Sequence, residues 1–213
     1  MNKTSLFFDL DGTLWDACDI TYESAKTISE NHNIKSPTYE DIVSGMGKTI
    51  DSCAKIYYPF LDIKESINLL NEISVIVVNK IINKEVKIYP NVNKVLIELS
   101  KNYDLYVISN TASVGYANAI NNYVDVSFKE NLACGSIGLN KGSGIKYIMK
   151  KNNIKKAIYI GDTNLDKISA SVANIPFIYC KYGFGNIKKC EYEINSFDEL
   201  INEIKKVIFL NWQ

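Results

Sequence analysis

The sequence predicts an α/β protein: a Rossmann-like parallel sheet covered by helices, with an all-helical cap inserted after the first strand. Short apolar runs, rich in β-branched and aromatic residues, alternate with segments of helical periodicity along most of the chain. Three of these runs lead directly into polar residues, and ligands of parallel sheets bind beyond the carboxyl ends of the strands. The pattern therefore predicts both the sheet and the edge of it where a site would form.

The predicted strands are short. Buried strands are expected at residues 6–8, 105–108, 157–160 and 177–180, with a weaker edge strand at 192–194. Amphipathic helices are expected at residues 92–101, 114–121, 143–151, 164–173 and 196–209. In the last of these helices, Ser196 is a candidate N-cap and Glu199 completes a capping-box pattern.

The segment from residue 16 to residue 87 differs from the rest because it contains no convincing strand run. Helical patterns occupy residues 21–32, 38–44, 49–58 and 62–84. We therefore predict two domains, which are a core made of residues 1–15 and 88–213 and a helical cap made of residues 16–87.

The composition argues against several classes of protein. Lys plus Arg and Asp plus Glu both number 24, and all the positive charge is Lys because the sequence has no Arg. A formal net charge of zero favours neither nucleic acid nor a membrane as partner. The five cysteines form no CxxC pair, which argues against a disulfide framework or a structural zinc site. The sequence shows no signal-peptide pattern and no apolar run long enough to span a membrane, so we expect a cytoplasmic protein. A monomer or a homodimer is expected.

The first motif with chemical content follows the first predicted strand. Asp9 and Asp11 are two residues apart, and Gly12 and Thr13 come directly after them. One carboxylate can attack phosphorus while the other protonates the leaving oxygen, which divides one difficult step into two easier ones. Gly12 permits a sharp turn away from the sheet. The same residues would also suit an Asx turn that closes a strand, but we favour the functional interpretation.

Three further features follow later predicted strands. Asp162 and Asp166 lie four residues apart at a strand end, where Asp162 could join Asp9 in holding a hard cation such as Mg²⁺; a helix N-cap with an acid in its first turn is the alternative. The Ser109 hydroxyl and the N–H groups of its turn could hold phosphate oxygens. Lys141 precedes a predicted helix, where its ammonium could neutralise phosphoryl charge.

In this order, the motifs DxDGT, SN, a Lys and GDTNLD resemble those of the haloacid dehalogenase-like superfamily, specifically its capped phosphatases of the phosphoglycolate phosphatase and β-phosphoglucomutase-like group. The resemblance covers nearly the whole chain. Pro90-Asn91-Val92 resembles the family's return from the cap, although Asn91 replaces the usual Gly. Gly142 also departs from the family pattern, because relatives often have Pro after the lysine.

The resemblance implies a role for each matching residue. Asp9 would be the nucleophile that forms an aspartyl-phosphate, and Asp11 the general acid and base. Mg²⁺ would be bound by Asp9, the backbone carbonyl of Asp11 and Asp162, while Lys141 stabilises the nucleophile and the phosphate. The residues expected to bind phosphate are Gly12, Ser109 and Asn110. Asp166 and Thr13 are expected to orient the residues that bind the phosphate and the metal, without contacting the substrate themselves.

The loop from Gly45 to Thr49 contains a Gly-Lys-Thr sequence but is not a Walker A loop, because Ile42 stands where that motif needs Gly. It resembles instead the substrate-facing cap loop of the family, which makes Lys48 a candidate substrate contact; a solvated cap lysine is the alternative. Tyr182 could line the entrance, and His32, the sole histidine, is expected to be structural or solvated.

The predicted function is a magnesium-dependent phosphatase that acts on a small phosphomonoester, of which phosphoglycolate-like or sugar-phosphate substrates are the ones the resemblance suggests. Asp11 favours ester cleavage, since a phosphate ester benefits from an acid that protonates its leaving group. The alternatives are a phosphomutase similar to β-phosphoglucomutase, which the absence of Arg disfavours, and a non-enzymatic sensor of a phosphorylated ligand.

Overall fold

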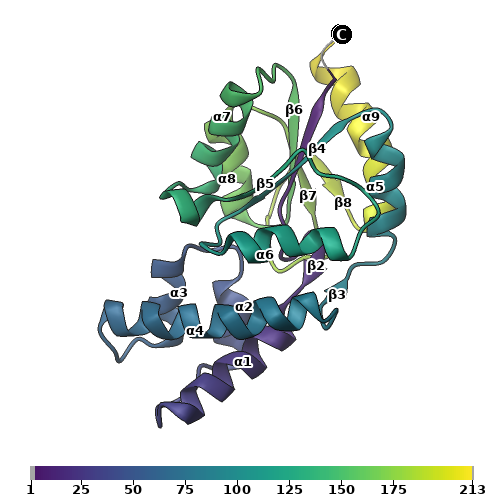
Figure 1. Ribbon diagram of the computed structural model, residues 1–213. Coiled ribbons are helices and arrows are strands. Elements are labelled where there is room, and N and C mark those ends of the chain that lie inside the picture. Colours follow the sequence, from purple (N-terminus) through teal and green to yellow (C-terminus); the bar gives the residue numbers. More distant parts are fainter. Residues whose placement is uncertain (1–2, 213) are drawn as a thin grey trace.

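A six-stranded parallel sheet in the order β5-β4-β1-β6-β7-β8 forms the core of the computed structural model, which describes residues 3–212 (Figure 1). The strands are β1 (Ser5–Phe8), β4 (Asp104–Ser109), β5 (Glu130–Ala133), β6 (Ala157–Gly161), β7 (Phe177–Cys180) and β8 (Tyr192–Ile194). The fold class is confirmed, and so are the five predicted strands, with β8 at an edge of the sheet.

Helices cover both faces of the sheet, as the continuous apolar strands require. In β1, Leu6 and Phe8 belong to the apolar cluster that includes residues of α5 and α9, whereas Phe7 belongs to the cluster that includes residues of α7 and α8. Figure 1 shows these two helix pairs on opposite sides of the strands. The helices of this core are α5 (Val92–Ser100), α6 (Val114–Asn118), α7 (Lys141–Lys151), α8 (Asn164–Ala173) and α9 (Leu200–Asn211).

Some local predictions were wrong. The helix expected at 114–121 ends at Asn118, and a 3₁₀ turn, η1 (Ala119–Asn122), follows it. A 3₁₀ turn, η3 (Phe197–Glu199), precedes α9, and the Ser196 side chain makes no capping hydrogen bond. Glu199 Oε2 instead accepts from the backbone N–H of Asn195 at 2.9 Å. Strand β5 and another 3₁₀ turn, η2 (Cys134–Ile137), were not predicted.

The insertion after the first strand is helical, as predicted. Its helices are α1 (Cys18–Asn31), α2 (Tyr39–Gly45), α3 (Ile50–Tyr57) and α4 (Ile63–Ile82). The chain enters it through β2 (Trp15–Asp16) and leaves through β3 (Lys87–Ile88), and these two short strands pair antiparallel. In Figure 1 the insertion lies beyond the carboxyl ends of the sheet strands, with α6 between it and the sheet.

The limits predicted for the two domains, at residues 15/16 and 87/88, stay a prediction, and residues 1–2 and 213 lie outside the described residues. We call residues 16–87 the cap below. Within residues 3–212, none of the helices combines the length and apolar character that a membrane span needs.

Candidate active site

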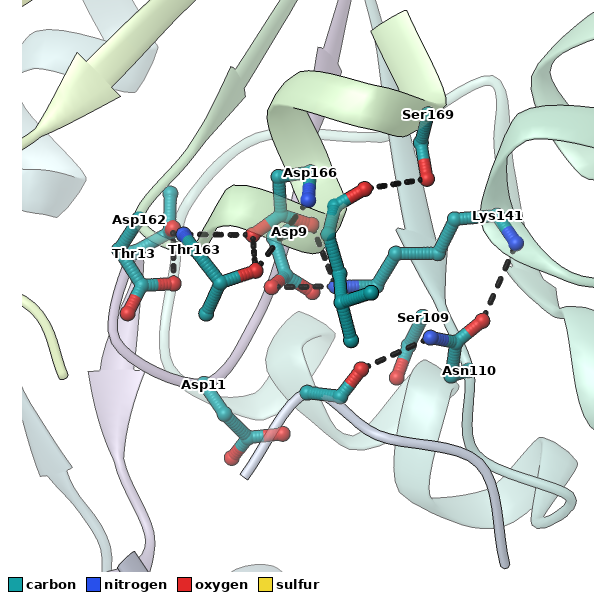
Figure 2. Close-up of polar contacts among 12 residues, drawn as sticks. Asp9, Asp11, Thr13, Ser109, Asn110, Lys141, Asp162, Thr163, Asp166 and Ser169 are labelled. Atoms are coloured by element: carbon teal, nitrogen blue, oxygen red, sulfur yellow. Dashed lines mark hydrogen bonds and ion pairs between the residues drawn. The ribbon is translucent and has the colours of Figure 1, made fainter. Parts of the chain in front are cut away.

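The predicted polar residues converge because they follow adjacent strands. Asp9 and Asp162 come directly after β1 and β6, and Ser109 is the last residue of β4; β1 lies between the other two strands in the sheet. Figure 2 shows the carboxylates of Asp9, Asp162 and Asp166 gathered at this edge. One oxygen of each lies within 4.8 Å of the others, and all three residues are buried.

Lys141 is the counter-charge of this cluster. It begins α7, whose N-cap residue Asn140 accepts a hydrogen bond from Ser143 N at 3.0 Å. Its ammonium lies 2.6 Å from Asp9 Oδ2 and 2.7 Å from Asp166 Oδ1, and the lysine side chain is only 1% exposed. Burial disfavours the charged amine, but the two carboxylates outweigh this effect and raise the pKa of Lys141 above its ordinary value. The lysine is therefore a fixed cation.

Asp166 holds the Lys141 ammonium in place. Its Oδ1 also accepts from Tyr159 OH at 2.7 Å, and its Oδ2 accepts from the backbone N–H and the hydroxyl of Thr163 at 2.9 and 2.5 Å. Thr163 Oγ1 accepts in turn from Asp166 N, which completes a capping box at the start of α8. Burial alone would raise the pKa of Asp166, but Lys141 and the other donors lower it. With both oxygens occupied by donors, Asp166 is suited to orient Lys141.

Asp162 is enclosed by close backbone. Its Oδ2 accepts from Phe184 N at 2.8 Å, and Thr13 Oγ1 lies at long hydrogen-bond distance, 3.5 Å, from its Oδ1. Gly12 has a φ of 80°, and a Cβ there would lie 2.1 Å from Asp162 Oδ2. A Cβ at Gly183 would lie 2.3 Å from the Asp162 Cβ. Two glycines are therefore required for this carboxylate to approach Asp9.

The cluster fits a hard cation. The buried Asp9 Oδ2 atom has Lys141 as ion-pair partner but accepts no hydrogen bond of good geometry from the described residues. Burial raises the pKa of Asp9 well above its ordinary value, despite the opposing effect of Lys141. Burial, with the nearby Asp166 charge, raises the pKa of Asp162 to about 7. Carboxylates with raised pKa values gain from a cation between them, and an all-oxygen donor set suits Mg²⁺.

Asp9, Asp162 and Asp166 each offer one carboxylate oxygen that could reach such an ion. Asp166 accepts the most hydrogen bonds of the three, which favours Asp9 and Asp162 as its ligands. The backbone carbonyl of Asp11 as a further ligand stays a prediction.

Asp11 lies apart from the cluster (Figure 2). It is 8% exposed, and its Oδ1 accepts from Trp15 Nε1 at 3.0 Å and from Tyr116 OH at 2.5 Å. Burial raises the pKa of Asp11, although the two hydrogen bonds partly oppose the shift. Because both donors occupy Oδ1, the other oxygen, Oδ2, is the one free to carry a proton. The arrangement suits a general acid.

The two polar residues at the end of β4 have different surroundings. Ser109 Oγ accepts from Thr111 N at 3.2 Å, so its hydroxyl hydrogen remains free to donate. Asn110 Nδ2 donates to Gly47 O in the cap at 2.8 Å, and its Oδ1 accepts from Lys141 N at 3.0 Å. Asn110 thus joins the cap to the start of α7. Its predicted contact with phosphate stays a prediction.

A cavity of about 390 Å³ lies between the cap and the core. Asp11, Ser109 and Asn110 line it from the core, and Lys48 lines it from the loop between α2 and α3. The structure therefore brings Lys48 to the same cavity as the predicted acid. Asp9 and Lys141 are buried and do not line this cavity, but a Cβ at Gly47 of the same loop would lie 3.9 Å from the Lys141 ammonium.

Two other residues are placed by their contacts. Tyr182 does not line this cavity; its OH donates to Thr13 O at 2.9 Å, and its ring packs 4.8 Å from that of Tyr89, so it braces the turn after β1. His32 Nε2 lies 2.9 Å from Glu72 Oε2 at the surface of the cap, which agrees with a structural or solvated histidine.

Sequence reasoning missed the residues that support the acids, which are Trp15, Tyr116, Tyr159, Thr163 and the backbone of Phe184. The capping pattern of Thr163 with Asp166 was available as a signal. Nothing in the local sequence indicates that Tyr116, 105 residues away, contacts Asp11.

Comparison with known proteins places the chain in a family. Residues 6–180 match the model of the haloacid dehalogenase-like hydrolases, and the chain belongs to that family. With its helical insertion after the first strand, it is of the capped type. No curated protein matches it by sequence.

Several solved structures are similar to this one. A predicted phosphatase from Clostridium acetobutylicum is 26% identical with a TM-score of 0.79, over 97% of this chain and 100% of that chain. A predicted phosphoglycolate phosphatase from Haemophilus somnus 129pt has 20% identity and a TM-score of 0.82, over 94% and 97%. The β-phosphoglucomutase from Clostridium difficile has 19% identity and a TM-score of 0.75, over 98% and 100%. The last two share the fold.

Proposed function

We propose that this hydrolase is a magnesium-dependent phosphatase that cleaves small phosphomonoesters through an aspartyl-phosphate on Asp9. The observation that carries the proposal is the division of labour between two buried acids. Asp9 is paired with a fixed cation, Lys141, whereas Asp11 is held separately on the side of the cap cavity. A nucleophile and a general acid have these two different requirements.

In the first step, a carboxylate oxygen of Asp9 attacks phosphorus and the bond from phosphorus to the ester oxygen breaks. Asp11, protonated on Oδ2, gives its proton to that oxygen, and the alcohol leaves. In the second step, Asp11 takes a proton from water, whose oxygen attacks phosphorus and releases inorganic phosphate from Asp9. Asp11 regains its proton, so the enzyme returns to its starting state.

Positive charge is needed where the phosphoryl oxygens gather. Lys141 supplies it from one side, and the Ser109 hydroxyl is free to donate to the same oxygens. Mg²⁺, held by Asp9 and Asp162, would add charge that balances the carboxylates and the phosphate. Closure of the cap over the site would exclude water, which would strengthen these interactions. We expect the enzyme to act in the cytoplasm.

A screen of phosphate release from metabolite phosphates, with and without Mg²⁺, tests the proposal. Phosphoglycolate and sugar phosphates belong in the panel because the family resemblance suggests them, and isomerisation of a sugar phosphate is measured in parallel to detect a mutase. The Asp9→Asn variant is expected to lose turnover by at least about 100-fold. The matched control is Asp51→Asn, an exposed acid of α3. Undiminished turnover by Asp9→Asn contradicts the assignment of the nucleophile.

A further inference from the structure

The cavity between cap and core has two chemically different sides. On the core side it is lined by Asp11, Ser109 and Thr111, which carry a carboxylate and two hydroxyls. On the cap side its lining is mainly aliphatic, from the α2–α3 loop and from α3 and α4: Met46, Ile50, Leu70, Ile73 and Val77. A phosphate ester bound with its phosphate toward the core would place its alcohol part against this aliphatic side.

The aromatic and thiol side chains in the cavity already donate their hydrogens within the protein. Tyr57 OH donates to Ile42 O at 3.2 Å, and Cys53 Sγ donates to Gly45 O at 3.3 Å. Tyr116 OH donates to Asp11. The tyrosine oxygens can still accept, and Thr21 and Ser74 add two hydroxyls to the lining, so a few substrate hydroxyls could be paired. Each further hydroxyl buried against the aliphatic side chains would lose its partners in water, which disfavours a polyol.

The polar residues that α4 contributes lie toward solvent. Asn71 is exposed and Ser74 is half-buried, in contrast to Leu70, Ile73 and Val77 of the same helix, which are buried. Val75 of this helix also lines the cavity and is exposed, so the outer part of the lining is mixed, whereas the part that is buried is aliphatic.

The lining offers one positive charge. Lys48 is the cationic residue among the residues that line the cavity, and Asp11 is neutral while it holds the proton that it gives to the leaving oxygen. Once that proton is transferred, Asp11 becomes an anion and the formal charges of the lining sum to zero. An alcohol part that carries a carboxylate or a second phosphate would then leave beside a like charge, which disfavours it.

The size of the cavity gives the last constraint. Its volume of about 390 Å³ is in the range of pockets that hold drug-sized ligands. The alcohol released from phosphoglycolate is a two-carbon acid, which would fill a small part of that space. A larger group would displace more water from the aliphatic lining, and that displacement favours binding.

We infer that the substrate of this enzyme is a phosphomonoester of a bulky, uncharged and largely apolar alcohol. The inference rests on the proposed phosphatase function and selects among its substrates. It excludes phosphoglycolate and simple sugar phosphates as preferred substrates.

A kinetic comparison of three primary-alcohol esters tests this preference. Benzyl phosphate carries an apolar ring, glucose 6-phosphate a polyol and phosphoglycolate a carboxylate. We expect kcat/KM for benzyl phosphate to exceed that for either other ester by at least about tenfold. Acetyl phosphate, which is small and activated, reports the chemistry independently of the cavity. The inference is overturned if acetyl phosphate is hydrolysed but kcat/KM for phosphoglycolate or glucose 6-phosphate equals or exceeds that for benzyl phosphate. The proposed phosphatase function would still stand in that case.

Binding of non-hydrolysable analogues separates the two proposals completely. Calorimetry with Mg²⁺ compares benzylphosphonate with phosphonoacetate, and we expect the benzyl compound to bind at least about tenfold more tightly. This measurement needs no turnover, so it tests the cavity even if acetyl phosphate is not hydrolysed. Equal binding, or tighter binding of phosphonoacetate, overturns the inference.

A pair of variants on α4 locates the effect. Val77→Thr places a hydroxyl of similar size in the aliphatic lining, and we expect it to lower the ratio of kcat/KM for benzyl phosphate to that for acetyl phosphate by about tenfold. Val78→Thr is the matched control, because Val78 is the next residue of the helix and does not line the cavity. An equal change of the ratio in both variants overturns the placement of the alcohol against α4.

Discussion

The Lys141→Met variant tests the electrostatics of the site most directly. The substitution keeps an unbranched side chain but removes the ammonium between Asp9 and Asp166, which lie 2.6 and 2.7 Å from it. All three side chains are at most 1% exposed, so the carboxylates cannot turn to water for compensation. Removing one partner of a buried ion pair costs about 3–5 kcal/mol.

The expected change in melting temperature follows from this loss of free energy. In a chain of 213 residues, each kcal/mol corresponds to about 2–4 °C in the unfolding midpoint, so metal-free Lys141→Met should melt roughly 6–20 °C below the wild type. Mg²⁺ should recover part of the loss, because it can balance Asp9 but leaves Asp166 unpaired. Phosphate release should fall by at least about 100-fold, as when one donor to a transition state is removed.

The assay is thermal unfolding followed by circular dichroism in EDTA and in Mg²⁺, together with phosphate release. The matched control is Lys146→Met, since Lys146 is exposed on the same helix. A metal-free Lys141→Met protein that melts within about 2 °C of the wild type would refute the reasoning, because a change of that size is at most about one kcal/mol.

Three other perturbations have defined outcomes. Gly12→Ala should weaken Mg²⁺ binding by at least about tenfold, because its Cβ would displace the Asp162 carboxylate; Gly138→Ala, with a φ of 68° and open space around it, is the calorimetric control for backbone strain. Tyr116→Phe removes a hydrogen bond that lowers the pKa of Asp11, so the basic limb of the kcat profile should move to higher pH. In the folded metal-free protein the pKa of Asp162 is raised from 3.8 to about 7, so the contribution of Asp162 to stability falls as the pH rises from about 4 to 7. Above this range Mg²⁺ no longer competes with a proton on Asp162. The gain in melting temperature from Mg²⁺ should therefore be larger at about pH 8 than at about pH 5.5.

Each of these has a result that contradicts it. Equal Mg²⁺ affinity in the two glycine variants would remove the steric argument for Gly12. A Tyr116→Phe profile that overlays that of Tyr147→Phe, an exposed tyrosine, would show that the hydrogen bond to Asp11 does not tune the acid. A Mg²⁺ gain that is the same at both pH values would mean that the ion does not replace a proton on Asp162.

The sheet was predictable where strands are buried on both faces. Continuous apolar runs such as that of β6 have no other stable placement in a chain of this kind. The edge strand β5 was missed because Glu130 and Asn131 interrupt its apolar pattern, and edge strands tolerate polar residues. The two-residue strands β2 and β3 are held by their pairing with each other, and residues that pair across 71 and 73 positions leave no local signal.

The acids of the site were predictable from topology, because the ends of adjacent parallel strands must meet. Their supporting contacts were less accessible. The capping box of Thr163 can be read from the sequence, but Tyr116 reaches Asp11 only because α6 lies between the sheet and the cap. The two hydrogen bonds of Asn110 likewise depend on where the cap loop comes to rest.

The β2–β3 pair also has an evolutionary consequence. Trp15 lies opposite Ile88 and Asp16 opposite Lys87, so the chain leaves the sheet domain and returns to it at neighbouring points. A segment attached in this way can lengthen, shorten or be exchanged as one block, while the order and spacing of the sheet strands stay the same. A tight turn from Asp16 to Lys87 would close the gap. Recombination at this junction can thus change what the protein recognises while its reactive centre is inherited intact.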